Sequence, residues 1–259
     1  MRMLLFAASV LASPALAAEL PADPLRSVMW NDMVERFLPG NVVFDDRVKV
    51  MVPKNAEDQF FVPVTVDAQA ISNVKEIVIL ADLNPIPKVL SFKPENAAPF
   101  IGTRIKVEQS TPVRAAVRTS DGVWHVGGSI IDAAGGGCSA PAQQYKNANW
   151  AETLGQTRAA ARREDAETAR VSLRIRHPMD TGLADGIPAF YLSHLTVTAD
   201  GGRSIGAIES YEPVSENPTF TLKAKVSTDE TALAFNGRDN EGNTYSFRLP
   251  VPTSQGASN

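Results

Sequence analysis

The stretch Val113-Arg114-Ala115-Ala116-Val117-Arg118, followed by Asp121-Gly122 and then by Val123-Trp124-His125-Val126, indicates the fold class of this chain. It consists of two short runs that are rich in β-branched and aromatic residues, with an Asp-Gly pair between them. Such residues favour strands, and Asp-Gly between two strand-like runs is the typical signature of a tight hairpin. We therefore predict two antiparallel strands here.

Strand-like segments continue in both directions from this hairpin. Short strands with turn residues between them, at this spacing, are typical of antiparallel β-sandwiches of about a hundred residues. The sequence therefore predicts an all-β protein with two sandwiches, one in each half of the chain. The upstream strands are expected at residues 48–52, 62–66, 77–80 and 101–107, and the downstream strands at 169–176, 190–197, 203–205, 219–226, 231–236 and 244–249.

Two segments differ from this pattern. Residues 23–38 read as a helix, because Asp23 can cap it, Pro24 stands at the first helical position and apolar residues follow a helical period. We expect the apolar stripe of this helix to cover one end of the sheet. Residues 150–170 are rich in Ala, Arg and Glu, and Asn149 can cap a helix there. A helix and a solvated linker both remain open for this segment.

The first 18 residues have the composition of a secretory signal peptide. They contain one positive charge, an apolar block and small residues at Ala15 and Ala17, so cleavage is expected after Ala17 or Ala18. The apolar block is shorter than the roughly 20 residues that a membrane-spanning helix needs. We expect an exported, soluble mature chain with no membrane span. The formal net charge of the whole sequence is -4, and its Lys and Arg residues are not clustered, so the chain lacks the basic footprint that nucleic-acid binding requires.

The chain contains one cysteine, Cys138, which follows Gly135, Gly136 and Gly137 and precedes Ser139. Cysteines of exported proteins normally pair, so an odd one indicates a thiol used for chemistry or for intermolecular bonding. Because glycine lacks a Cβ atom, this run predicts a flexible arm that exposes the thiol to solvent. One alternative is a core cysteine, which the small, polar neighbours disfavour. The other is a linker with an incidental cysteine, which is disfavoured because an exposed thiol is an oxidation liability in an exported protein.

No residue near Cys138 in the sequence can activate its thiol. Lys, Arg and His are absent between Ile130 and Lys146, so no local cation lowers the pKa of the thiol unless folding brings one close. This pattern indicates a passive thiol that is activated in the active site of a partner, and not an enzyme. His125, His177 and His194 show no metal-ligand spacing, so no metal and no cofactor is predicted.

Two groups of motifs resemble a known family. Residues 175–182 read Ile-Arg-His-Pro-Met-Asp-Thr-Gly, and together with Asn217-Pro218 and residues 239–245 they resemble SoxZ of the bacterial sulfur-oxidation system. The first half, which ends in Gly-Gly-Gly-Cys, resembles its partner SoxY. The chain is therefore similar, over residues 25–252, to a natural fusion of the two, of the SoxYZ-like type associated with quinoprotein dehydrogenases.

The resemblance implies two Ig-like β-sandwiches that pack tightly on each other, in a periplasmic carrier of the thiosulfate-oxidation type. The carrier cysteine, which corresponds to Cys138, would hold sulfur intermediates while sulfur-oxidation enzymes or a quinoprotein dehydrogenase system act on them. Two chains could also join through Cys138. The implied division is a signal peptide (1–18), a SoxY-like sandwich (19–140), a linker (141–167) and a SoxZ-like sandwich (168–259).

One departure from SoxY affects the arm. In SoxY the arm is the free C-terminus and typically reads Gly-Gly-Cys-Gly, whereas here Ser139 and about 120 further residues follow the cysteine. The arm is therefore tethered at both ends, and its cargo can differ from thiosulfate-derived sulfur. The alternative function is a binding or accessory module for a periplasmic quinoprotein dehydrogenase, in which Cys138 would have no chemical role.

Overall fold

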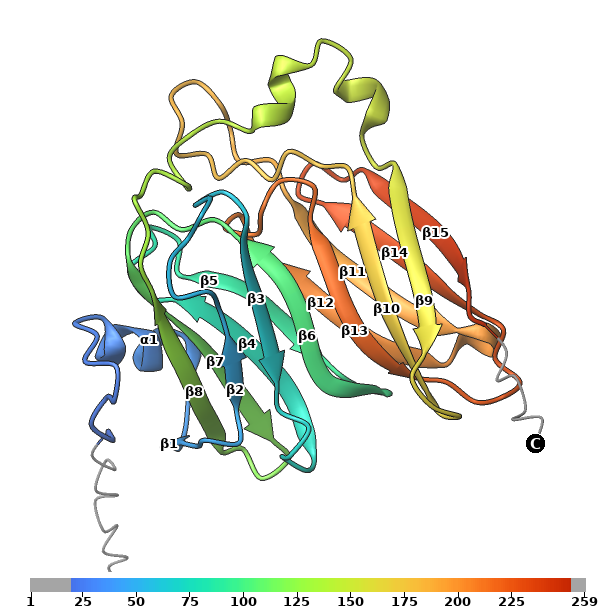
Figure 1. The fold of residues 1–259 in the computed structure, drawn as a ribbon, viewed down its shortest axis with the longest axis horizontal. Helices are drawn as coiled ribbons and strands as arrows, with labels where there is room; N and C mark the ends of the chain where they lie inside the picture. Colours follow the sequence, from blue (N-terminus) through green and yellow to red (C-terminus); the bar gives the residue numbers. More distant parts are fainter. Residues whose placement is uncertain (1–19, 253–259) are drawn as a thin grey trace, which may run out of the picture.

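The chain folds into a two-layer β-sandwich, and the computed structural model describes residues 20–252 (Figure 1). Within these residues one sheet has nine strands, in the order β1-β8-β7-β4-β5-β12-β11-β14-β15, and the other has six, in the order β2-β3-β6-β13-β10-β9. This arrangement confirms the predicted all-β fold. The predicted signal peptide lies outside the described residues.

The elements follow each other along the chain with short connections. The first half contains α1 (Trp30–Phe37), β1 (Val42–Phe44), β2 (Lys49–Met51), β3 (Val62–Asp67), β4 (Val74–Ala81), β5 (Lys88–Lys93), β6 (Ala97–Ile105), β7 (Thr111–Thr119) and β8 (Trp124–Ile131). Two 3₁₀ turns, η1 (Gln143–Lys146) and η2 (Ala151–Thr153), lead into the second half. That half contains β9 (Thr157–Arg163), β10 (Thr168–Ile175), β11 (Leu192–Ala199), η3 (Asp200–Gly202), β12 (Ser204–Ser210), β13 (Thr219–Lys225), β14 (Ala232–Asp239) and β15 (Thr244–Pro250).

The two halves share both sheets. β5 pairs with β12, where Phe92 lies opposite Ile208, and β6 pairs with β13, where Ile101 lies opposite Leu222. The main hydrophobic core also contains residues of both halves without a break between them. Backbone ladders and core both cross the junction, so the chain forms one continuous sandwich where two were expected. Pairing at the junction also covers strand edges that each half would otherwise expose.

The N-terminal helix is shorter than the predicted range of 23–38. Arg26 has a φ of 52°, which lies outside the helical region, and the carboxylate of Asp23 accepts the backbone N–H groups of Leu25 and Ser27 in a turn. The same carboxylate lies 2.6 Å from the guanidinium of Arg114 in β7. Asp23 is therefore held by an ion pair with a residue that is distant in the sequence. Local capping signals cannot predict such a contact, so they placed the start of the helix too early.

α1 packs on the outer face of the nine-stranded sheet over β1, β8, β7 and β4, which form one end of the sheet, as its apolar stripe predicted. Along β4, Ile77 and Ile79 face the main core, whereas Val78 and Leu80 face α1 in a second core that also contains Trp30. Alternate residues of the strand are thus buried on opposite faces. In the described part of the chain, no helix has the length and apolar character that crossing a membrane requires.

The segment that was expected to be a helix or a solvated linker contains a strand. β9 pairs antiparallel with β10 at the edge of the six-stranded sheet, and its side chains alternate between half-buried and exposed. Ala159 and Ala161 pack against the main core, while Arg158 and Arg162 are exposed. The helix prediction is wrong because the Ala/Arg pattern has a period of two, which tertiary pairing with β10 selects over the helix propensity of these residues.

Candidate functional site

Cys138 belongs to the segment between β8 and η1, and this segment lies at one end of the sandwich (Figure 1). Its exposed fraction is 1%, so the expectation of a solvent-exposed thiol is wrong for this conformation. Residues 133–142, which we call the arm, are docked against both halves of the chain.

Glu108, which follows β6, binds the backbone of the arm. Its Oε2 accepts the N–H groups of Cys138 at 2.9 Å and of Ser139 at 3.1 Å, and its Oε1 accepts the Ser139 hydroxyl at 2.9 Å. The N–H of Gly136 donates to the carbonyl of Glu108, and the N–H of Gly137 to the carbonyl of Val107, both at 3.1 Å. Hydrogen bonds to a charged group are stronger than neutral ones, so this carboxylate fixes a segment that has few side chains to pack.

The glycines of the arm permit close approach between backbones. A Cβ atom on Gly137 would lie 2.5 Å from the carbonyl oxygens of Gln59 and Val107. Gly135 has a φ of 103°, and its Cβ would lie 2.8 Å from the carbonyl oxygen of Glu108. The prediction treated these glycines as a source of flexibility, but in this structure they allow the arm to dock.

The second half of the chain closes over the other side of the arm through residues 177–182, which we call the motif loop. The hydroxyl of Thr181 donates to the carbonyl of Cys138 at 2.6 Å. Asp180 accepts the N–H of Ala142 at 3.0 Å and the hydroxyl of Tyr145. The structure thus brings together two sequence features, the glycine-cysteine run and the His-Pro-Met-Asp-Thr-Gly motif, that lie in different halves.

Lys106 is a site residue that its sequence context did not reveal. It is 3% exposed, and its Nζ donates to the carbonyl of Met179 in the motif loop. Met179 has a φ of 55°, which is unusual for a residue with a side chain. Burial lowers the pKa of Lys106, while the nearby acidic groups, Asp180 first among them, oppose this shift. The only available signal was a lysine between Ile105 and Val107 in an apolar strand.

Comparison with known families divides the chain in the same way. The family model described as "Sulfur oxidation protein SoxY" matches residues 35–138, and the one described as "Sulphur oxidation protein SoxZ" matches residues 157–249. This chain belongs to the SoxY and SoxZ families. It joins them in one polypeptide, with Cys138 as the last residue of the SoxY match and the motif loop inside the SoxZ match.

Solved structures give weaker similarities. The sulfur carrier protein SoxY from Chlorobium limicola f thiosulfatophilum is 21% identical and covers 40% of this chain and 96% of its own, with a TM-score of 0.37. A glycosyl hydrolase family 2 member from Bacteroides cellulosilyticus is 11% identical, and the alignment covers 74% of this chain and 24% of the hydrolase, with a TM-score of 0.22. No curated protein matches the chain. The family assignment therefore rests on the two family models.

The docked position keeps the thiol of the SoxY half protonated. The pKa of Cys138 is raised to about 12, mainly by burial; the Lys106 ammonium group opposes this rise and the Glu108 carboxylate adds to it. The thiolate is the reactive form of cysteine, and it is a very small fraction at neutral pH when the pKa is this high. Folding does bring a cation near the thiol, but the cation does not activate it in this conformation.

His177 of the SoxZ half supports the motif loop. Its Nδ1 accepts the N–H of Met179 at 3.2 Å, which places the ring proton on Nε2, 3.6 Å from the carboxylate of Asp239. Burial lowers the pKa of His177 to about 4. His194 is exposed on β11 and His125 pairs with Asp45, so the structure does not bring the histidines together. Within residues 20–252, no three His, Cys, Asp or Glu side chains are arranged to hold a metal ion.

Alanine at position 137 should displace the arm. We expect Gly137→Ala to speed the reaction of Cys138 with an aromatic disulfide reagent by at least about tenfold, which corresponds to about 1.4 kcal/mol in the docking equilibrium, because the new methyl group meets fixed backbone oxygens. Ala134→Ser is the matched control. It also adds one heavy atom to the arm, but at an exposed position, so the reaction rate should stay within about twofold. An equal or larger acceleration by the control would contradict the docked geometry.

The buried His177 predicts a pH-dependent stability. In the unfolded chain its pKa is near the ordinary 6.5, and in the folded chain it is about 4. Protons therefore bind preferentially to the unfolded state as pH falls through this window, and stability is lost. From pH 7 to pH 5 we expect a loss of about 2 kcal/mol from this group, measured by urea unfolding.

Replacement of the histidine provides the control for that measurement. His177→Gln should remove most of the pH slope, whereas His194→Gln, at an exposed position, should keep it. Burial raises the pKa values of Asp82 and Glu216. Protonation of these two groups therefore favours the folded state as pH falls, which opposes the effect of His177. An undiminished slope in His177→Gln would show that another group causes the effect.

Proposed function

We propose that this SoxY and SoxZ fusion is a covalent carrier of sulfur-containing intermediates, with Cys138 as the attachment point. The observation that supports the proposal is the placement of the chain's one thiol. Glu108 of the SoxY half and Thr181 of the SoxZ half bind the backbone on either side of it. An incidental cysteine in a linker would need no such positioning by two halves of the protein.

In this proposal the arm alternates between a docked and a released position. The docked thiol is buried and its pKa is about 12, whereas a released thiol has an ordinary pKa near 8.5 and can enter the active site of a partner. The arm is tethered at both ends, so it moves as a loop. An extended segment from Ala133 to Cys138 spans about 17 Å, at roughly 3.4 Å per residue.

The oxidation and transfer steps belong to partner enzymes. Joining the Cys138 thiolate to a thiol-type sulfur through an S–S bond releases two electrons, and a chain with a single cysteine has no internal disulfide that could accept them. The electrons must therefore pass to a partner. We propose sulfur-oxidation enzymes or a quinoprotein dehydrogenase system as partners, and the periplasm as the location, on the basis of residues 1–18 and of the family.

Substitution of the cysteine tests the role of the thiol in cells. Cys138→Ser should abolish the sulfur-dependent phenotype of the gene while leaving the abundance of the protein unchanged. Ala134→Ser is the matched control, because it adds the same hydroxyl group at an exposed position of the same arm. Full activity of Cys138→Ser would contradict the carrier proposal and would favour a non-catalytic accessory module.

A further inference from the structure

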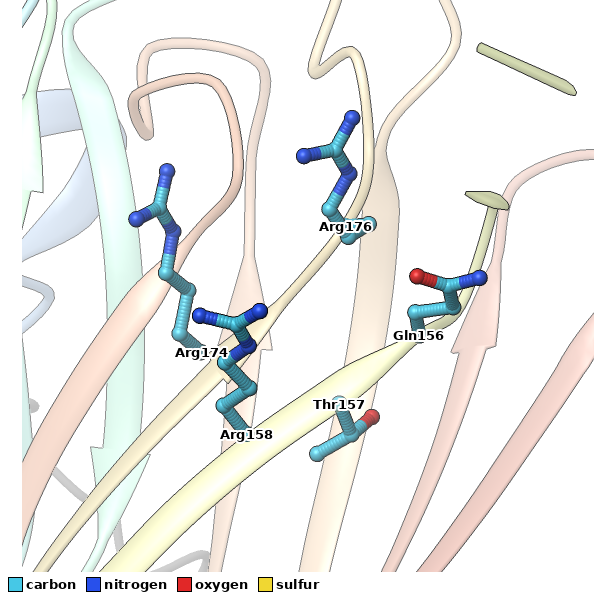
Figure 2. Close-up of a pocket in the computed structure, with 5 residues that line it drawn as sticks. All are labelled: Gln156, Thr157, Arg158, Arg174 and Arg176. Atoms are coloured by element: carbon cyan, nitrogen blue, oxygen red, sulfur yellow. The ribbon is translucent and has the colours of Figure 1, made fainter. Parts of the chain in front are cut away.

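Three arginines line one pocket on the exposed side of β9 and β10 (Figure 2). The pocket has a volume of about 400 Å³ and is lined by Arg158, Arg174 and Arg176 together with Gln156 and Thr157. Arg176 directly precedes the motif loop, and its backbone is hydrogen-bonded to Gly155 and Gln156. The pocket therefore adjoins the loop that covers the Cys138 arm, at the same end of the sandwich.

The strand register places like charges opposite each other. Arg158 and Arg174 are direct partners in the ladder between β9 and β10, and Arg176 follows on the same side two residues later. Figure 2 shows their guanidinium groups pointing in the same direction. Like charges directly opposite on adjacent strands are destabilising. A bound anion would offset the repulsion among these three cations.

No such anion is provided by residues 20–252. None of the three arginines forms a salt bridge or a side-chain hydrogen bond within this range, and the Nε of Arg176 is buried without a partner. The next arginine pair on the same two strands provides a contrast. Arg162 lies opposite Arg170, and the carboxylate of Glu164 lies 3.7 Å from each of them. A carboxylate thus offsets the positive charge of one arginine pair on these two strands, whereas the described residues provide none for the pair of Arg158 and Arg174.

We propose that this pocket binds a small, multiply charged oxyanion of the sulfate or phosphate type. Guanidinium groups present planar forks of N–H donors that match the spacing of two oxygens on such ions, and a buried, unpartnered N–H gains more from an acceptor than an exposed one. Gln156 and Thr157 add neutral polar groups to the lining. The volume exceeds that of one such ion and leaves room for its bound water. This inference does not depend on the role of Cys138.

Calorimetric titration of the full chain tests the proposal. Sodium sulfate, thiosulfate and phosphate are titrated separately, with sodium chloride at equal ionic strength as the reference. The thiosulfate arm uses the Cys138→Ser variant, so that reaction at the thiol contributes no heat. We expect saturable binding of at least one oxyanion, and the tightest of the three identifies whether the natural ligand is a sulfur or a phosphorus oxyanion.

Substitutions of arginines on β9 and β10 separate binding at this site from general charge effects. Arg174→Gln should weaken binding at least about tenfold, the loss of one charge-assisted hydrogen bond, and Arg158→Gln should act in the same direction. Arg170→Gln, whose partner is Glu164, should leave the affinity within about twofold. Heats that follow ionic strength alone, or equal losses in Arg170→Gln and Arg174→Gln, would overturn the proposal. So would binding of a short polyglutamate peptide without binding of any inorganic oxyanion, because that result would assign the pocket to an acidic partner protein.

Discussion

Glu108→Ala is expected to increase the reaction rate of Cys138 with an aromatic disulfide reagent by about 100-fold. The carboxylate accepts hydrogen bonds from Cys138 and Ser139, and each such bond contributes about 1–1.5 kcal/mol or more. Loss of about 3 kcal/mol from the docked state raises the released fraction by about two orders of magnitude. The rate is measured with excess reagent at pH 8 on the folded protein.

Two further variants define what this result means. Glu108→Gln keeps one acceptor oxygen and should give an intermediate rate, while Glu95→Ala, an exposed residue of the same half, should leave the rate unchanged. The rates of all variants should rise with pH through about 8.5, because the reacting species is the released thiol with its ordinary pKa. An unchanged rate in Glu108→Ala would show that the carboxylate does not hold the arm.

Arg114→Met is expected to lower the free energy of unfolding by about 3–5 kcal/mol at pH 7. The side chain of Arg114 is 1% exposed and lies 2.9 Å from the fully buried carboxylate of Asp82 and 2.6 Å from that of Asp23. Burial raises the pKa of Asp82, while Arg114 opposes this shift. Without the guanidinium, Asp82 is a buried charge with no cation beside it, and such a charge costs more than the lost contacts alone.

Arg118→Met is the matched control for this prediction. Arg118 lies in the same strand and pairs with Glu76 at 3.0 Å, but its side chain is 43% exposed, so its loss should cost less than about 1 kcal/mol. Removal of Arg114 raises the folded-state pKa of Asp82 further above its unfolded value. The destabilisation should therefore shrink as pH falls through that folded-state pKa, where Asp82 becomes neutral. Urea unfolding curves that show equal losses for the two arginine variants would contradict the account.

The strands could be predicted because their signals are local. The hairpin expected at residues 113–126 forms as β7 and β8, with Arg118 opposite Trp124 around the Asp121-Gly122 turn. The shared sheets could not be predicted in this way. The pairing of Phe92 with Ile208 joins residues that are distant in the sequence, and no local pattern specifies which strand edges meet. The strand β9 was missed because its alanines and arginines also favour helices.

The residues of the candidate site were visible in the sequence, but their contacts were not. Glycines before Cys138 are compatible both with a flexible arm and with close backbone approach, and the structure favours the second. The choice depends on Glu108 and Thr181, which lie 30 and 43 residues from Cys138. The sequence motifs were sufficient to find both halves of the site and to suggest the family. The burial of the thiol could not be predicted from them, because it depends on contacts that only the folded structure shows.

The carrier function is tested most directly by the intact mass of the protein purified from cells that are oxidising reduced sulfur compounds, recorded before and after treatment with a reductant. The account predicts an added sulfur-containing mass that maps to Cys138, is removed by the reductant and is absent from Cys138→Ser. A wild-type protein that always has the mass of the unmodified chain under these conditions would contradict it.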